Sequence, residues 1–200
     1  MKNNKEKSSI YTKLLSSFSY RAELINNSSE SLANQILNIA ELTEKAIKNG
    51  NKILFCGNGG SAAEAQHMAA EYCATLDHTR PRKGMAAIAL TTDSSFITAW
   101  TNDFGFEDVF KRQVETLGQP KDILMAYSTS GNSENILRAA CAAQKIGITV
   151  ILYTGDHEKT KIEKYADIIF KSPSSSTPII QEFHTIAGHE ICSLVEEHLL

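Results

Sequence analysis

A histidine and a carboxylate lie on one face of a predicted helix that directly follows a glycine-rich loop. The loop contains Gly57, Gly59 and Gly60, and the helix carries His67 and Glu71. Because these two side chains are four residues apart, they share one face of the helix. Glycines let a backbone turn sharply and approach a ligand, and the free N–H groups at a helix N-terminus attract anions. The pattern therefore favours proton-transfer or metal chemistry on a phosphorylated substrate.

The helix after this loop is rich in alanine, and this composition bears on the role of its polar residues. We expect the helix to span about residues 60–76 and Ser61 to cap it. An exposed histidine–glutamate pair is the ordinary interpretation of such a spacing. The small side chains around this pair predict instead that the helix is mostly buried. Buried polar residues need hydrogen-bond partners or a functional role.

A second histidine lies in the last predicted helix, eight residues after a glutamine. Taken alone, His189 is typical of a hydrogen-bonded core histidine; with His67, Glu71 and Gln181 it completes a nitrogen and oxygen set that could bind zinc. On an unbroken helix, Gln181 and His189 are separated by about 12 Å. We therefore expect these two to serve sites built from different chains, or one of them to have a role other than ligation. His184 and His198 are interpreted as solvated or interface residues.

Hydroxyl side chains fill a second loop, Ser128–Ser133, just before another predicted helix. The loop has no cation, so it would bind a phosphate monoester through neutral donors and the helix dipole. Taken alone, this sequence is typical of an ordinary turn and helix cap. Together with the glycine loop it favours a phosphate site.

The glycine loop also fits a dinucleotide-binding fingerprint, Gly57-x-Gly59-x-x-Ala62. That fingerprint requires an acidic residue about 20 positions later, at the end of the second strand. The nearest candidate, Asp93, follows Gly57 by more than thirty positions. The sequence therefore disfavours a nucleotide site.

Short apolar runs alternate with helical segments through the rest of the chain. Strands are expected at 52–56, 85–90, 122–127, 149–153 and 167–170. A helix capped at 92–94 is expected to run to 100 and to be followed by a turn at 102–105. Further helices are expected over 107–117, from 134 to about 145 and from Thr177-Pro178 to about 198, with a short one after Asp156. This alternation predicts an α/β, flavodoxin-like three-layer sandwich with a five-stranded parallel sheet of order 2-1-3-4-5. In that order the first and third strands are neighbours, so the glycine loop and Ser128–Ser133 open into one crevice.

The N-terminal quarter of the chain reads as helical. Residues 1–8 are polar and expected to be frayed, and amphipathic helices are expected over 9–25 and 30–49. These helices could cover the sheet or pack against another subunit. We expect one domain over 1–200, with an N-terminal helical segment (1–49) and an α/β core (50–200).

Composition excludes several classes of protein. A net charge of -3 gives no reason to expect a nucleic-acid partner, and no apolar run is long enough to span a membrane. The polar N-terminus is not a signal peptide. The four cysteines, at positions 56, 73, 141 and 192, lie in apolar segments without metal-ligand spacing. They are interpreted as reduced core residues of a cytoplasmic protein.

Five ordered segments carry a resemblance to a known family: CGNGGSAAEAQHMAAE, AIALTTD, TNDFGFEDVF, STSGNS and TPIIQEFHTIAGH. From Lys52 to the C-terminus, the chain resembles the phosphoheptose isomerases of the sugar isomerase (SIS) domain family. This resemblance implies an aldose–ketose isomerase that converts sedoheptulose 7-phosphate to D-glycero-D-manno-heptose 7-phosphate through an enediolate. The reaction is the first step towards ADP-heptose for lipopolysaccharide cores. It also implies a cytoplasmic homotetramer with active sites shared between subunits.

The resemblance further assigns roles to individual residues. Glu71 and His189 would be the acid/base pair, and one zinc per subunit would be held by His67, Glu71, Gln181 and His189. The implied substrate-binding residues are Asn58, Gly59, Gly60, Ser61, Glu71, Asn102, Asp103, Ser128, Thr129, Ser130, Ser133 and Gln181.

One position departs from the family pattern, since members often carry arginine where this chain has Thr75. Either Arg80 or Arg82 supplies the missing charge to the phosphate, or the substrate preference differs. The main alternative function is a non-catalytic SIS-domain protein that binds a sugar phosphate or a replication initiator. The presence of both Glu71 and His189 argues against it. Another sugar-phosphate isomerase or a nucleotide-binding protein is the remaining alternative.

Overall fold

Five parallel strands lie side by side in the order β2-β1-β3-β4-β5 in the computed structural model, which describes the backbone of residues 2–199 and the side chains of residues 6–199. The strands are β1 (Ile53–Cys56), β2 (Ala87–Ala89), β3 (Ile123–Tyr127), β4 (Thr149–Thr154) and β5 (Ile168–Lys171). All four neighbouring pairs are parallel, and Phe55 on β1 faces Ala89 on β2 and Met125 on β3. The predicted fold class and strand order are confirmed.

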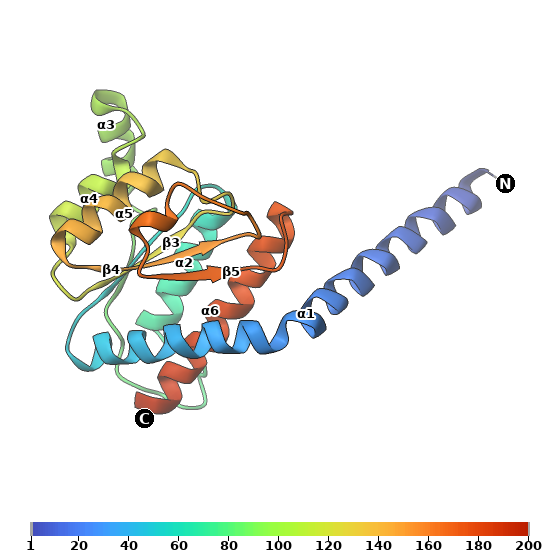
Figure 1. Cartoon of the computed structure of the whole chain (residues 1–200), viewed down its shortest axis with the longest axis horizontal. Coiled ribbons are helices and arrows are strands. Elements are labelled where there is room, and N and C mark those ends of the chain that lie inside the picture. Colours follow the sequence, from blue (N-terminus) through green and yellow to red (C-terminus); the bar gives the residue numbers. More distant parts are fainter. Residues whose placement is uncertain (1, 200) are drawn as a thin grey trace.

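Helices cover both faces of this sheet (Figure 1). The described residues form α1 (Lys2–Lys48), α2 (Gly60–Cys73), α3 (Ser94–Phe104), α4 (Val109–Leu117), α5 (Glu134–Ile146), α6 (Thr177–Leu199) and the 3-10 helix η1 (Glu163–Tyr165). Successive strand residues point to opposite faces. Phe55 and Met125 therefore pack with α1, α2 and α6, whereas Leu54 and Leu124 pack with α4 and α5. Among the described residues, no helix has the length and apolar character needed to cross a membrane.

The N-terminal segment is one long helix, α1, instead of the two helices predicted. Asn26 to Ser29 favour helix ends, but no proline or glycine interrupts the segment, and the Ser29 hydroxyl donates to the Asn26 carbonyl within the helix (3.2 Å). The C-terminal half of α1 packs on α6 and β5, while its N-terminal half projects away from the sheet (Figure 1). The backbone is helical from Lys2, contrary to the expected frayed start, and residue 1 lies outside the described part.

Two local predictions were wrong, and two others were confirmed. The segment expected to turn at 102–105 belongs to α3, which ends at Gly105, where φ is +92°. Asp93 does cap α3, because its carboxylate accepts from the Phe96 N–H (2.9 Å). The short charged helix expected after Asp156 is present as η1, which begins at Glu163. Among the four free cysteines, Cys73 is exposed and is therefore not a core residue.

His184 is buried in the core, which overturns its interpretation as a solvated residue. It follows Ile180 by one turn of α6 and precedes Ala187, so it shares their inward face. Its ring packs within 5.7 Å of the Tyr127 ring and 5.6 Å of the Tyr153 ring, measured between centroids. Burial lowers the pKa of His184 to about 4, although its contact with the Thr154 carbonyl opposes this shift.

Loss of the neutral state of His184 should make folding sensitive to mild acid. Since the pKa is about 4 in the folded chain and about 6.5 in the unfolded chain, the unfolded state binds more protons between these values. The contribution of neutral His184 to the free energy of unfolding is fully present above pH 6.5. It falls by about 3 kcal/mol as the pH drops towards 4. We expect His184→Phe to flatten this dependence in urea unfolding measured from pH 7 to 4.5.

The control is His78→Phe, which removes an exposed histidine and should keep the wild-type slope. An unchanged slope in His184→Phe would show that another group causes the acid sensitivity.

Candidate active site

The glycine loop connects β1 to α2 through backbone geometry that only glycine allows. At Gly59, which is the N-cap of α2, φ is +56°. A Cβ on Gly57 would overlap the backbone carbonyl of Ser61, so the chain could not fold back as it does. The prediction that Ser61 caps the helix is wrong, because Ser61 lies inside the first turn and is buried. The N-terminus of α2 is thereby open towards the loop.

The two ligand-like loops are joined by a reciprocal pair of amide hydrogen bonds. Asn58 in the glycine loop donates to Asn135 Oδ1, and Asn135 donates to Asn58 Oδ1, both at 2.9 Å. Asn135 is buried near the start of α5, just after the Ser128–Ser133 loop. The two loops therefore lie side by side, as the strand order predicts. No sequence pattern indicates this role for Asn135, because its partner is 77 positions away.

The Ser128–Ser133 loop is held in shape by contacts to its backbone. The Thr129 carbonyl accepts from the Gly155 N–H (3.1 Å) and lies 3.0 Å from His157 Nε2. Ser128 donates to the Ser133 hydroxyl (3.3 Å). The exposed Ser130 hydroxyl accepts from the Asn132 N–H (3.2 Å), which leaves its own hydrogen free to donate. The loop thus presents a hydroxyl donor beside the N-terminus of α5.

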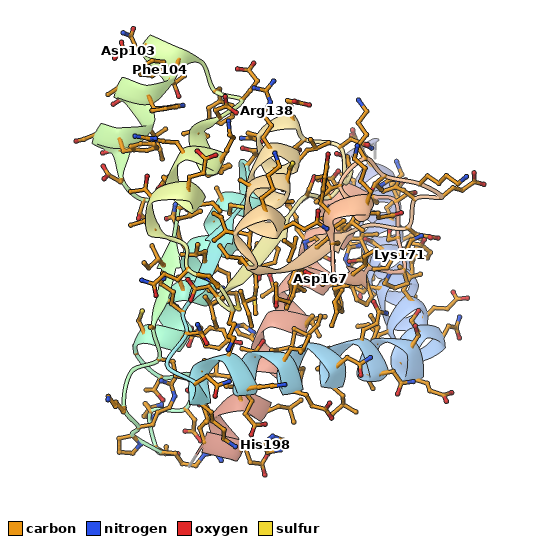
Figure 2. All side chains as sticks on the ribbon, turned by 60° about the vertical axis from the view of Figure 1, so that its left-hand side comes forward. Asp103, Phe104, Arg138, Asp167, Lys171 and His198 are labelled. Carbon is orange, nitrogen blue, oxygen red and sulfur yellow. The ribbon has the colours of Figure 1, made fainter. Side chains whose placement is uncertain are left out.

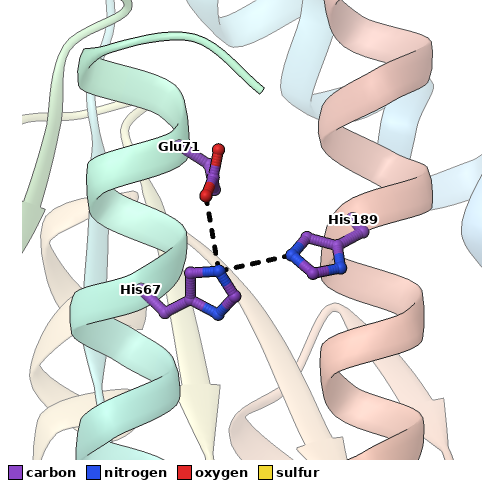
Figure 3. Close-up of side chains that lie close together, drawn as sticks. All are labelled: His67, Glu71 and His189. Carbon is purple, nitrogen blue, oxygen red and sulfur yellow. Dashed lines mark hydrogen bonds and ion pairs between the residues drawn. The ribbon is translucent and has the colours of Figure 1, made fainter. Parts of the chain in front are cut away.

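His67, Glu71 and His189 converge between α2 and α6 (Figure 3). His67 Nε2 lies 3.3 Å from Glu71 Oε1 and 3.3 Å from His189 Nε2. One ligand atom from each residue lies within 4.8 Å of the others. His67 is exposed, and the other two are partly buried, so the group is open to solvent and to a ligand.

The spacing of this group fits a divalent metal. Two nitrogens bonded to a tetrahedral zinc at about 2.0–2.1 Å lie about 3.4 Å apart. The two imidazole nitrogens observed here are 3.3 Å apart, and a carboxylate oxygen completes the group. Since Glu71 and His189 meet within one chain, the arrangement does not require a second subunit to bring the acid/base pair together.

Gln181, the fourth predicted ligand, lies farther along the same groove. The groove is lined by Gly60, Ala63, Glu64, His67, Pro178, Gln181, Glu182 and Thr185. A Cβ on Gly60 would be 2.7 Å from Gln181 Nε2, so this amide faces the first turn of α2. Gln181 and His189 therefore both face α2 of their own chain. This arrangement does not support the prediction that the two residues serve sites built from different chains.

Glu64 is a buried carboxylate behind His67 that the sequence analysis missed. Its Oε2 accepts from the Thr185 hydroxyl (2.7 Å) and lies 3.8 Å from His67 Nδ1. Its Oε1 has no hydrogen-bond partner among the described residues. The spacing of three residues before His67 on the same helix could have identified it. A carboxylate in this position lies on the Nδ1 side of the ring, while Nε2 faces Glu71 and His189.

Two predicted substrate residues lie away from this groove. Asn102 and Asp103 are exposed near the end of α3, where the Asn102 amide donates to Asp103 Oδ1 (2.8 Å). Figure 2 shows Asp103 at the outer end of that helix. Neither residue lines the groove between α2 and α6.

The two arginines proposed as phosphate ligands are both engaged elsewhere. Arg80 pairs with Asp77 at 2.7 Å. Arg82 is 5% exposed and pairs with Glu196 at 2.6 Å, so it is not available to a phosphate. Thr75 also contacts this carboxylate, with its hydroxyl 3.3 Å from Glu196 Oε1. Arg82 therefore does not supply the positive charge that an arginine at position 75 would bring to the phosphate.

Comparison with known proteins identifies the family. The model of the SIS domain matches residues 18–155. The phosphoheptose isomerase of Aquifex aeolicus is 47% identical over 168 residues, which cover 84% of this chain and 86% of that protein. The solved phosphoheptose isomerase of Neisseria gonorrhoeae is 37% identical, with a TM-score of 0.86, over 94% of this chain and 99% of that one. The phosphoheptose isomerase structure from Francisella tularensis is 33% identical, with a TM-score of 0.88, over 94% and 98% of the two chains.

Replacement of His67 should abolish metal binding at this group. His67 Nε2 lies close to both other ligand atoms, so His67→Ala removes the central ligand. We expect a loss of at least about 100-fold in Co²⁺ affinity, measured by titration of the visible absorption of bound Co²⁺. The control His198→Ala, which removes a histidine paired with Glu44, should bind Co²⁺ like the wild type. Equal affinity in His67→Ala would place the metal elsewhere.

Proposed function

This chain belongs to the SIS domain family, and we infer that it is a phosphoheptose isomerase. The observation that carries this inference is the convergence of His67, Glu71 and His189 between α2 and α6, in a chain 47% identical to a phosphoheptose isomerase. The substrate is sedoheptulose 7-phosphate, and the product is D-glycero-D-manno-heptose 7-phosphate. A non-catalytic sugar-phosphate-binding protein would not need this convergence of acid/base groups.

The reaction moves one proton between carbons and one between oxygens. A base removes a proton from C1 of the open-chain ketose, which gives an enediolate, and the proton is then returned to C2. The O1 hydroxyl loses its proton as the aldehyde forms, and O2 gains one. Two groups are therefore required, a base at carbon and a proton carrier at oxygen.

We assign the carbon base to Glu71 and the oxygen proton carrier to His189. Glu71 uses Oε1 towards His67, which leaves its second oxygen to face C1 and C2. A single carboxylate on one face of the enediolate can reach both C1 and C2. It can therefore take the proton from one carbon and return it to the other without a change in position. His189 meets His67 through Nε2, so its imidazole lies where it can serve the neighbouring oxygens.

We further propose that the metal is zinc, held by His67, Glu71 and His189, and that Gln181 becomes the fourth ligand when its side chain, which faces Gly60, leans along the groove towards the group. Bound zinc would polarise the substrate carbonyl as a Lewis acid. Support comes from the 3.3 Å spacing of the imidazole nitrogens. Glu64, behind His67, would orient that ligand through its carboxylate.

The substrate phosphate is assigned to the Ser128–Ser133 loop. Its donors would be the hydroxyls of Thr129, Ser130 and Ser133 together with the N-terminus of α5, which favours an anion, while Ser128 donates to Ser133 and supports the loop. The neighbouring loop, with Asn58, Gly59, Gly60 and Ser61, would contact the sugar. Gln181 would approach the sugar from α6, where it faces Gly60.

We propose that the enzyme is a cytoplasmic homotetramer in which subunits share active sites. Ile10, Leu14 and Phe18 are spaced along one face of α1 and are 55%, 52% and 66% exposed, as expected for an apolar surface that another subunit covers. Asn102 and Asp103, exposed on α3, would then reach the site of a neighbour. The whole chain, 1–200, would form one SIS domain with residues 1–49 at the subunit contacts. The product would enter lipopolysaccharide core synthesis.

Removal of either proton-transfer group should reduce turnover with little change in binding. Glu71→Gln keeps the shape of the side chain but removes the base, and His189→Asn removes the proton carrier. Each should lower kcat by about two to four orders of magnitude in a coupled assay with sedoheptulose 7-phosphate. Glu190→Gln, at an exposed position beside His189, is the control and should keep wild-type kcat. Near wild-type turnover in either active-site variant would refute its assignment.

Loss of a hydroxyl in the phosphate loop should act mainly on binding. Phosphate contacts are similar in the ground state and the transition state, so Ser130→Ala should raise KM more than it lowers kcat. Steady-state kinetics should show this split, with exposed Thr116→Ala as the control. Sedoheptulose without its phosphate should bind poorly to the wild type. Equal affinity for the two sugars would mean that this loop does not bind the phosphate.

A further inference from the structure

The backbone carbonyls in the last turn of α2, which carries Glu71, have few hydrogen-bond donors within the helix. The helix ends at Cys73, and the Ala74 N–H returns to the Ala70 carbonyl (2.8 Å). The last carbonyls of any helix lack partners within that helix. Those of Glu71 and Tyr72 therefore need donors from elsewhere, and helix ends without such donors fray.

Arg82 provides these donors from the loop that precedes β2. Its guanidinium donates from Nη2 to the Glu71 carbonyl and from Nη1 to the Tyr72 carbonyl, both at 2.9 Å. The Tyr72 carbonyl also accepts from the Met85 N–H (3.0 Å), so the Glu71 carbonyl is the one that relies on Arg82. The Arg82 side chain is 5% exposed, so these bonds are shielded from water. A cation at the C-terminus of a helix also complements the helix dipole.

Glu196 holds the same guanidinium from the other helix of the site. It lies on α6, accepts from Arg82 Nε (2.7 Å), and its side chain is 1% exposed. Its carboxylate also accepts from the Leu76 N–H (2.8 Å) and the Asp77 N–H (3.3 Å), two groups just beyond α2. Burial raises the pKa of Glu196, but these hydrogen bonds and Arg82 outweigh burial and lower it overall, so the group stays charged.

This contact ties together the two helices that carry the acid/base pair. Glu196 follows His189 by seven residues, or about 10.5 Å along α6. Arg82 contacts the backbone of Glu71 itself. One buried ion pair thus fixes the end of α2 to the same helix that presents His189.

We propose that Arg82 and Glu196 are positioning residues that set the separation of Glu71 from His189. Neither would touch the substrate. Without them the last turn of α2 loosens and Glu71 moves away from its working position, while the phosphate loop is unaffected. A misplacement of about 1 Å costs about 100-fold in rate, so a large loss of kcat is expected. The catalytic part of this proposal rests on the isomerase function proposed above.

The test compares two variants that each leave a buried carboxylate without its cation. Arg82→Met breaks the pair with Glu196, and Lys52→Met breaks a pair with Asp122, another carboxylate that is 1% exposed. Lys52 precedes β1, at the opposite end of that strand from the glycine loop. Both variants should have a lower Tm. Below both transitions, Arg82→Met should lose about 10- to 100-fold in kcat with KM within about threefold of wild type, and Lys52→Met should keep its kcat.

Two further measurements keep the test decisive. Arg82→Lys retains the charge without the planar fork, so it should recover part of kcat, and it replaces Arg82→Met if that variant does not fold. Titration with Co²⁺ reports on the His67, Glu71 and His189 group without any substrate. Arg82→Met should shift the visible absorption and weaken affinity about tenfold or more, and Lys52→Met should match the wild type.

Wild-type kcat and an unchanged Co²⁺ spectrum in folded Arg82→Met would overturn the proposal. Equal losses of kcat in Arg82→Met and Lys52→Met would overturn it as well, because the effect would then be general destabilisation. If the wild type does not turn over sedoheptulose 7-phosphate, the proposed function fails, and the Co²⁺ titration alone decides whether Arg82 positions the group.

Discussion

The site depends on how closely α2 and α6 approach each other over one face of the sheet. Gly188 lies at their contact, where a Cβ would overlap Met68 Sδ. Ala65 and Ala187 are fully buried in the same core cluster, and their small side chains also permit close packing. Because the backbones are this close, short side chains from the two helices can meet. A larger residue at position 188 would force the Met68 side chain to move and would disturb the packing beside the imidazoles, whose Nε2 atoms lie 3.3 Å apart.

The helices α2 and α6 run parallel, and polar side chains bridge them at several points along their length. At one end, Gln181 faces Gly60 beside the glycine loop. At the other end, Glu196 accepts from the Leu76 N–H beyond the end of α2. The His67, Glu71 and His189 group lies between these contacts. The arrangement fixes the position and the tilt of one helix on the other, which a proton transfer between two closely spaced carbons requires.

Much of this fold follows from local pattern, and the site follows only in part. Buried apolar runs reveal the strands, and the spacing of four residues places His67 and Glu71 on one face. Pattern did not reveal Arg82 and Glu196 as partners, because they are 114 positions apart and meet only when the loop before β2 lies against α6. His184 was misjudged for a related reason. A single polar residue on an apolar face is buried or exposed according to its neighbours in space, here the aromatic rings on β3 and β4.

Solvent exchange during turnover tests the central claim most directly, namely that Glu71 carries a proton between C1 and C2. Sedoheptulose 7-phosphate is converted in D₂O, and the aldose product is analysed by ¹H NMR. A carboxylate base exchanges its proton with solvent during at least part of the turnovers, so deuterium should appear at C2. Glu71→Gln should form no such product at a comparable rate. Deuterium at C2 formed by Glu71→Gln at the wild-type rate, or no product from the wild type, would contradict the account.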